Sequence, residues 1–150
     1  MAMLQELNPA RERRSTEKLR RYWSSVAGEN AVPCLSGFSI RINETEWRKR
    51  FLLKEDVEPS MSVFIFCGAN AQMLFDGSPV SKTMLEAAPP HLRDDFCRNC
   101  ENVTSRLDTV SEEGSYWLHG EEVFYRYILL PVTSSSHERG YILGAFSTSS

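Results

Sequence analysis

Four cysteines and three histidines are the residues with which this chain could perform redox or metal chemistry. Cys97 and Cys100 form a Cys-x-x-Cys motif inside a helical sequence pattern. A structural zinc site needs two further ligands, and a c-type haem site needs histidine where Glu101 stands. A thioredoxin-like pair belongs at a helix start after a strand. The motif therefore indicates small core residues, and Cys34 and Cys67 are likewise expected to be buried thiols.

The histidines lie where side chains are usually solvated. His91 follows Pro89-Pro90 at the entrance of an expected helix, and His119 and His137 lie in turns. A haem iron needs a neutral imidazole delivered into an apolar slot, and only His91 precedes a suitable helix. We expect surface histidines, with no haem and no metal.

Enzyme signatures are missing from the sequence. It contains no glycine-rich phosphate loop, no Gly-x-Ser-x-Gly elbow and no His-Glu-x-x-His motif. The carboxylate pairs Asp94-Asp95 and Glu121-Glu122 occupy adjacent positions and cannot both point into one cleft. We therefore expect a protein that is not an enzyme.

Arg126 is the most unusual charged residue, because it stands between Tyr125 and Tyr127 in an apolar strand pattern. If its side chain faces a pocket, the guanidinium suits a ligand that carries a carboxylate. If it faces the other side of the sheet, the side chain reaches solvent and has no binding role. The sequence leaves both alternatives open.

The amino-acid composition is typical of one soluble domain. The 150 residues are 41% hydrophobic and 25% charged, with a formal net charge of −3. The longest apolar runs are far shorter than the ~20 residues of a membrane span. The first residues lack the pattern of a secretory signal, so we expect a cytoplasmic protein with reduced cysteines and no membrane partner. The mild acidity argues against a dedicated nucleic-acid binder.

The expected elements begin with a helix over residues 15–27, after a polar lead over 1–14. Ser15 or Thr16 is placed to cap this helix, and Gly28 to end it. Its apolar side chains recur at helical spacing and form one stripe, consisting of Leu19, Tyr22, Trp23 and Val26.

Residues 15–150 are expected to form a single domain, and the elements that follow the leading helix predict an α+β fold. Asn43 can cap a short helix that leads into strands at 51–53 and 62–67. A short helix over 70–75 and a longer one over 90–105 follow, and strands are expected at 109–118, 122–132 and 140–146. This order indicates an antiparallel sheet of about five strands, with helices inserted between the second and third.

Two strands, a helical middle and three strands resemble the PAS fold, and the details are similar to a bacterial subgroup of single-PAS proteins. Four features carry the resemblance: Leu19, Tyr22 and Trp23 in the leading helix; Phe64 to Cys67 followed by Phe75-Asp76-Gly77; Leu129-Leu130-Pro131 late in one strand; and Gly140 with Gly144 around the last. The resemblance spans Thr16 to Phe146, and its motifs are mainly structural.

The resemblance implies a sensory or interaction module with a ligand pocket between the sheet and the middle helices. Arg98-Asn99-Cys100 matches only three letters of the flavin-binding signature of the light-sensing branch, so we expect no flavin. Bulky side chains should fill most of the pocket, and no cofactor is expected. The expected pocket residues are Met73, Phe75, Met84, Leu85, Phe96, Cys100 and Trp117, with Arg126 as the possible ligand-binding cation.

The leading helix is the expected contact surface. An isolated helix of this length is marginal in water, so its stripe must dock on the sheet, on a second subunit, or on both. We expect both, which predicts a homodimer or a protein partner contacted through Leu19, Tyr22, Trp23 and Val26. The resulting hypothesis is a non-enzymatic PAS-like module that signals through these contacts. The alternative is an α+β domain whose function is to bind a small metabolite or, less favoured, haem.

Overall fold

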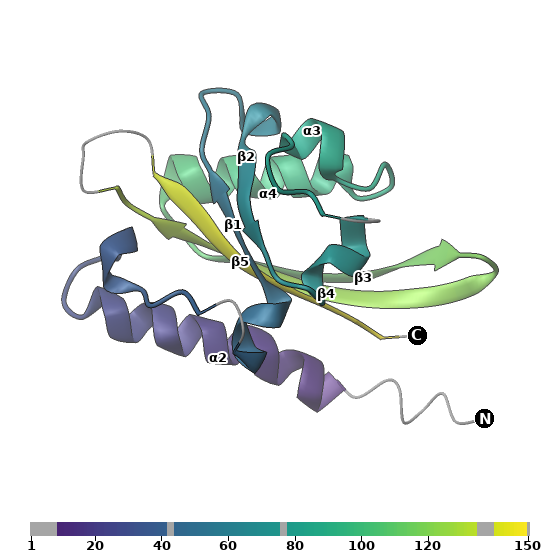
Figure 1. The fold of residues 1–150 in the computed structure, drawn as a ribbon, viewed down its shortest axis with the longest axis horizontal. Helices are drawn as coiled ribbons and strands as arrows, with labels where there is room; N and C mark the ends of the chain where they lie inside the picture. Colours follow the sequence, from purple (N-terminus) through teal and green to yellow (C-terminus); the bar gives the residue numbers. More distant parts are fainter. Residues whose placement is uncertain (1–8, 42–43, 76–77, 135–139, 150) are drawn as a thin grey trace.

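An antiparallel sheet with helices on both faces forms the protein (Figure 1). The computed structural model describes residues 9–41, 44–75, 78–134 and 140–149. One long helix covers one face of the sheet, and the helices of the middle segment cover the other. No helix within these residues is long and apolar enough to cross a membrane.

The strands follow the order expected from the sequence. They are β1 Arg50–Lys54, β2 Val63–Cys67, β3 Val110–Leu118, β4 Glu121–Val132 and β5 Tyr141–Ser149. Their order across the sheet is β2-β1-β5-β4-β3, and all neighbours are antiparallel. The last strand therefore lies between the first strand and the β3–β4 hairpin, and β2 and β3 form the two edges. The expected α+β architecture is confirmed.

Helices lie at the four expected positions with different ends, whereas the helix Met84–Ala87 was not expected from the sequence. The α-helices are α2 Pro9–Ala27, α3 Met84–Ala87 and α4 Arg93–Arg106. Short 3₁₀ turns are η1 Leu35–Gly37, η2 Thr45–Lys49, η3 Pro59–Met61 and η4 Ala71–Phe75.

One expected helix cap differs from the structure, and a second lies outside the described residues. Because α2 begins at Pro9, a residue suited to the first helical position, neither Ser15 nor Thr16 caps it. The expected cap Asn43 lies outside the described residues, and Glu44 precedes η2. Gly28 follows α2 with φ +59, as a left-handed helix end requires.

The apolar stripe of α2 packs against the chain's own sheet. Leu19 has no exposed surface, the Trp23 indole N–H donates to the Pro131 carbonyl at 2.8 Å, and the Tyr22 hydroxyl accepts from the Ser39 amide at 2.8 Å. Val26 lies against Gly37, where an added Cβ would be 2.6 Å from a valine methyl carbon. Leu19 therefore has no surface left for a second subunit, and pairing through Tyr22, Trp23 and Val26 stays a prediction.

Side chains on the two faces of the sheet form separate cores. The inner cluster lies between the sheet and α3 and α4, and contains Phe51, Leu53, Phe64, Met84, Phe96, Cys100, Tyr127, Leu129 and Phe146 among others. The outer cluster lies between the sheet and α2, and contains Leu19, Trp47, Leu52, Ile128, Leu130, Val132, Leu143 and Ala145. Alternation along each strand separates the two sets, because successive side chains point to opposite faces.

Candidate functional site

The inner face of the sheet is where the expected ligand pocket was placed, and aromatic rings occupy it. Phe51, Phe64, Phe96, Tyr127 and Phe146 are all at most 2% exposed. The ring centroid of Phe96 lies 6.0 Å from that of Phe51 and 5.2 Å from that of Tyr127. These rings come from four strands and α4, so they join the helical layer to the sheet.

Several predicted pocket residues lie together in this layer. Met84, Phe96 and Cys100 belong to the inner cluster with at most 2% exposure, and Phe75 is half-buried against it. Met73 belongs to η4, but its side chain lies outside the described residues. The prediction that bulky side chains occupy this region agrees with these positions; whether the region binds a ligand stays a prediction.

Trp117 and Leu85 were placed wrongly in the pocket. Trp117 is 70% exposed, near the end of a β3–β4 hairpin that extends past the described end of α2 (Figure 1). Its register partner is Glu122, which puts it on the outer side of the hairpin. Leu85 is 46% exposed on α3.

Arg126 does not point into the pocket either. It alternates with Tyr125 and Tyr127, which belong to the inner cluster, so its side chain lies on the outer face. There the guanidinium forms an ion pair with Glu113, its register partner on β3. Of the two alternatives left open by the sequence, the structure supports the outer face, with a carboxylate of the same chain as the partner.

A buried polar network closes one side of the inner cluster. The Tyr127 hydroxyl donates to the Glu112 carboxylate at 2.9 Å and accepts from the Asn99 side-chain amide at 2.8 Å. The Asn99 amide also donates to the same Glu112 oxygen. Tyr127 is 1% exposed, whereas Asn99 and Glu112 are half-buried. The carboxylate therefore stands between the core and the surface.

A row of rings leads from the surface to this network. His91 lies 4.4 Å from Tyr116 between ring centroids, Tyr116 lies 6.1 Å from Tyr125, and Tyr125 stacks at 6.0 Å on Tyr127. Burial raises the pKa of all three tyrosines, so their hydroxyls remain protonated donors at neutral pH. Donors beside a carboxylate acceptor can bind a small polar molecule.

The Asn99–Glu112–Tyr127 network was not predicted from the sequence. The spacing of Tyr125 and Tyr127 places both on one strand face, and this signal was available. Glu112 and Asn99 have no such signal, because strand pairing and the packing of α4 bring them to Tyr127.

The cysteines do not form a reactive or metal-binding group. Burial raises the pKa of Cys67 to about 12, and it also raises the pKa of Cys97 and Cys100. Cys97 lies with its sulfur 3.4 Å from the Met84 sulfur, as a packed core residue does. Cys34 is only half-buried, contrary to expectation, and the Ser36 hydroxyl lowers its pKa by donating to the sulfur.

Metal binding finds no support in the part of the chain that the structure describes. No group of three or more histidine, cysteine, aspartate or glutamate side chains there is arranged to hold an ion.

No protein-family model matches the sequence, and no curated protein matches it. Solved structures do match. The PAS domain of Bordetella pertussis BvgS is 16% identical, with 87% of this chain and 85% of that chain covered and a TM-score of 0.49. The Vibrio cholerae VqmA dimer, from a structure that concerns DNA binding by LuxR-type receptors, is 12% identical, with a TM-score of 0.51. The match covers 67% of this chain and 46% of the VqmA chain.

A Light-Oxygen-Voltage domain studied with a flavin analogue is also similar. It is 8% identical, with 71% of this chain and 80% of that chain covered and a TM-score of 0.51. At such identities the likeness concerns the fold, and function has to be argued from the residues of this chain. The expected subgroup of single-PAS proteins stays a prediction.

Proposed function

Because the chain has a PAS-like fold, we propose that it is a non-enzymatic sensory or protein-interaction module. The observation that carries the proposal is the inner face, where PAS-like domains are expected to receive a ligand. Five rings there have at most 2% exposure, and they connect the helical layer to the sheet. Such a layer transmits a displacement of α4 to β4, because close-packed side chains cannot move independently.

The first test is an absorption spectrum and a native mass spectrum of the full chain purified from its own host. We expect the mass of the polypeptide without a chromophore, since the chain's own rings occupy the inner face. Stoichiometric haem or flavin would overturn this part of the proposal.

We further propose that the module associates with a second copy of itself through the outer side of the β3–β4 hairpin. Trp117 is 70% exposed and Phe124 is 38% exposed on that side. They adjoin β3, an edge strand whose free backbone groups another strand can pair. Two copies of one edge can pair antiparallel about a two-fold axis, which places the outer faces of both hairpins side by side. This surface replaces the α2 stripe as the expected interface.

The association is tested by sedimentation velocity of the full chain and of the double variant Trp117→Ala, Phe124→Ala. We expect a dimer for the wild type and a monomer for the variant. The control is Leu85→Ala, an equally apolar and exposed position on α3, which should remain dimeric. A monomeric wild type at high concentration, or a dimeric double variant, contradicts the interface.

A structural change at the inner face would reach this interface through β4 and α2. Tyr127 packs inward and Ile128 outward on the same strand, and α2 binds that strand through Trp23 and Pro131. Arg20 of α2 also donates to the Ser111 hydroxyl of β3 at 3.0 Å. Amide hydrogen exchange provides the test. We expect dimerisation to alter exchange in α2, and identical exchange in monomer and dimer would contradict this route.

The polar network favours a second candidate, a domain whose function is to bind a small polar molecule. Tyr127 and Asn99 both donate to one oxygen of the Glu112 carboxylate at the edge of the inner cluster, so the other oxygen can accept from a ligand. A thermal-shift screen of small amines and polyols tests this candidate. A ligand that stabilises the wild type and not Glu112→Gln supports it, and the absence of any such ligand favours the interaction module.

A further inference from the structure

The two edges of the sheet differ in what covers them. At the β2 edge, the Phe64 amide donates to the Lys82 carbonyl at 3.0 Å, and the Ser81 amide donates to the Phe64 carbonyl at 2.8 Å. The segment before α3 therefore pairs with this edge. At the other edge, β3 forms no backbone hydrogen bond outside the sheet within the described residues. Free backbone groups of this kind can pair with another strand.

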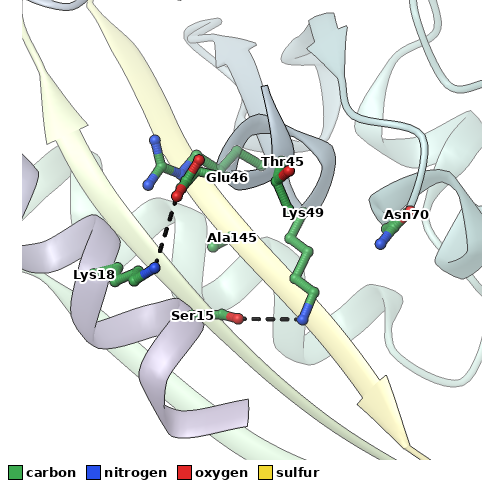
Figure 2. Close-up of a pocket in the computed structure, with 8 residues that line it drawn as sticks. Ser15, Lys18, Thr45, Glu46, Lys49, Asn70 and Ala145 are labelled. Carbon is green, nitrogen blue, oxygen red and sulfur yellow. Dashed lines mark hydrogen bonds and ion pairs between the residues drawn. The ribbon is translucent and has the colours of Figure 1, made fainter. Parts of the chain in front are cut away.

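The helix α2 leaves the β3 edge open. Toward η2, the Lys49 ammonium donates to the Ser15 hydroxyl at 3.3 Å, and Figure 2 shows this contact on the side of α2 where β1 begins. Toward β3, the Arg20 guanidinium donates to the Ser111 hydroxyl at 3.0 Å. The second contact uses a side chain of β3, so the backbone groups of the strand are not involved.

The turn of the β3–β4 hairpin determines which backbone groups of β3 are free. His119 and Gly120 have φ +51 and +81, as a two-residue type I′ turn requires. Such a turn bonds the Leu118 carbonyl to the Glu121 amide, so this register pair is hydrogen-bonded. Hydrogen-bonded pairs alternate with non-hydrogen-bonded pairs along an antiparallel ladder. The residues whose N–H and C=O groups point to the free edge are therefore Ser111, Glu113, Ser115 and Trp117.

Gly114 is the central residue of the nine-residue strand β3. Its register partner is Tyr125, and a Cβ added to Gly114 would lie 2.6 Å from the Tyr125 hydroxyl oxygen. The tyrosine ring thus leans across β3 into the space that a side chain at position 114 would fill. Its hydroxyl has no hydrogen bond within the described residues. A glycine inside a strand often marks a close approach of another backbone.

Building on the dimer proposed above, we propose that two copies pair their β3 strands antiparallel about a two-fold axis at Gly114. This register aligns all nine residues of β3 and pairs free backbone groups with free backbone groups, whereas any shift shortens the ladder. Glu113 then lies opposite Ser115 of the second copy, so glutamates are not directly opposed. An axis at Glu113 would oppose two like charges.

The same axis brings the two Tyr125 hydroxyls together. Facing residues of a non-hydrogen-bonded pair have Cβ positions about 4.5–5.5 Å apart, and each hydroxyl lies beside the Cβ position of Gly114. The hydroxyls can share a hydrogen bond directly or through one water. Because Tyr125 stacks on Tyr127 at 6.0 Å and on Phe146 at 6.1 Å, the inner cluster would contact the second copy through one side chain.

The register also gives exposed Trp117 a partner. Its side chain is 70% exposed in one chain. In the dimer Trp117 lies opposite Ser111 of the second copy, beside the Arg20 guanidinium that donates to that serine. Indole is the preferred aromatic partner of such a cation.

The test is an isotope-filtered nuclear Overhauser experiment on dimers mixed from labelled and unlabelled full chains. Hα atoms face each other in non-hydrogen-bonded antiparallel pairs. We therefore expect intermolecular Hα–Hα contacts from Gly114 to Gly114 and from Glu112 to Tyr116. Contacts from Tyr116 to Tyr116 would overturn the axis and leave the dimer intact, whereas a monomeric wild type would overturn both proposals.

Ser115→Pro and Ser115→Ala form a matched pair of variants. Both lose the hydroxyl that donates to Glu122, but only proline also removes the Ser115 N–H from the free edge. That N–H bonds the second copy and not β4, so the hairpin ladder is kept. We expect Ser115→Pro to be monomeric in sedimentation velocity and Ser115→Ala to be dimeric, with folding checked by circular dichroism. A folded, dimeric Ser115→Pro would overturn the proposal.

Tyr125→Phe tests the axis without changing the backbone. Loss of one hydrogen bond worth about 0.5–1.5 kcal/mol weakens the dimer about 2- to 13-fold. The control is Tyr141→Phe, which lies on β5 and is separated from β3 by β4, and it should dimerise as the wild type does. Equal dimer affinities for Tyr125→Phe and Tyr141→Phe would contradict the hydroxyl contact at the axis.

Discussion

Replacing Tyr127 with phenylalanine isolates the contribution of one buried hydroxyl. The ring would remain packed between Phe96 and Phe146, while two hydrogen bonds disappear, to Glu112 at 2.9 Å and from Asn99 at 2.8 Å. A hydrogen bond to a charged group contributes about 1.5–3 kcal/mol, and the Asn99 amide still reaches Glu112, which limits the loss. We therefore expect Tyr127→Phe to lower the free energy of unfolding by about 1.5–3 kcal/mol.

Urea unfolding followed by circular dichroism measures this loss. For a chain of this size, a loss of 1 kcal/mol in the free energy of unfolding lowers Tm by about 2–4 °C. In thermal unfolding, the Tm of Tyr127→Phe should therefore be about 3–12 °C below that of the wild type. Tyr116→Phe is the matched control, because Tyr116 belongs to the same ring row and its hydroxyl has no hydrogen bond within the described residues. The reasoning is refuted if Tyr127→Phe destabilises the protein no more than Tyr116→Phe does.

Three further predictions concern pH, thiol reactivity and helix docking. The tyrosines of the ring row have pKa values raised by burial above the ordinary 10.0, so their stabilising effect is complete below pH 10 and is lost as pH rises above it. The urea midpoint should fall above pH 10, and a constant midpoint would contradict buried hydroxyls. Cys34, with its lowered pKa, should react with iodoacetamide before the buried Cys100, and mass spectrometry of timed digests checks the order. Leu19→Ala should cost about 2–5 kcal/mol in urea unfolding because it leaves a cavity under α2, and a change below 1 kcal/mol would contradict the docking.

Local patterns were sufficient for the order and type of the main elements. The apolar run at β2 and the turn residues around the closing strands predict strands, because alternation and turn chemistry are properties of a few neighbouring residues. The start of α2 was missed because the helix continues into a polar segment that lacks an apolar periodicity. The capping box of Thr83 and Glu86, which begins α3, was a readable signal that the sequence analysis did not use.

The candidate site was predicted less completely. Phe96 and Cys100 were assigned to the core from their helical spacing, and both are buried there. Trp117 was assigned to the pocket from its size, but a hydrophobic side chain is buried only where another element covers its strand. The hairpin extends past α2, and no local pattern reports that length.

Local sequence patterns are enough to predict which residues share a face. Alternation separates Tyr127 from Arg126 on β4, and helical spacing gathers Leu19, Tyr22 and Trp23 on α2. What each face packs against depends on how distant parts of the chain come together. Strand pairing gives Arg126 its carboxylate Glu113, and α2 covers the sheet of its own chain. Likewise, the Lys49 ammonium meets the Ser15 hydroxyl only because α2 packs beside η2, a contact between residues 34 positions apart that no periodicity encodes.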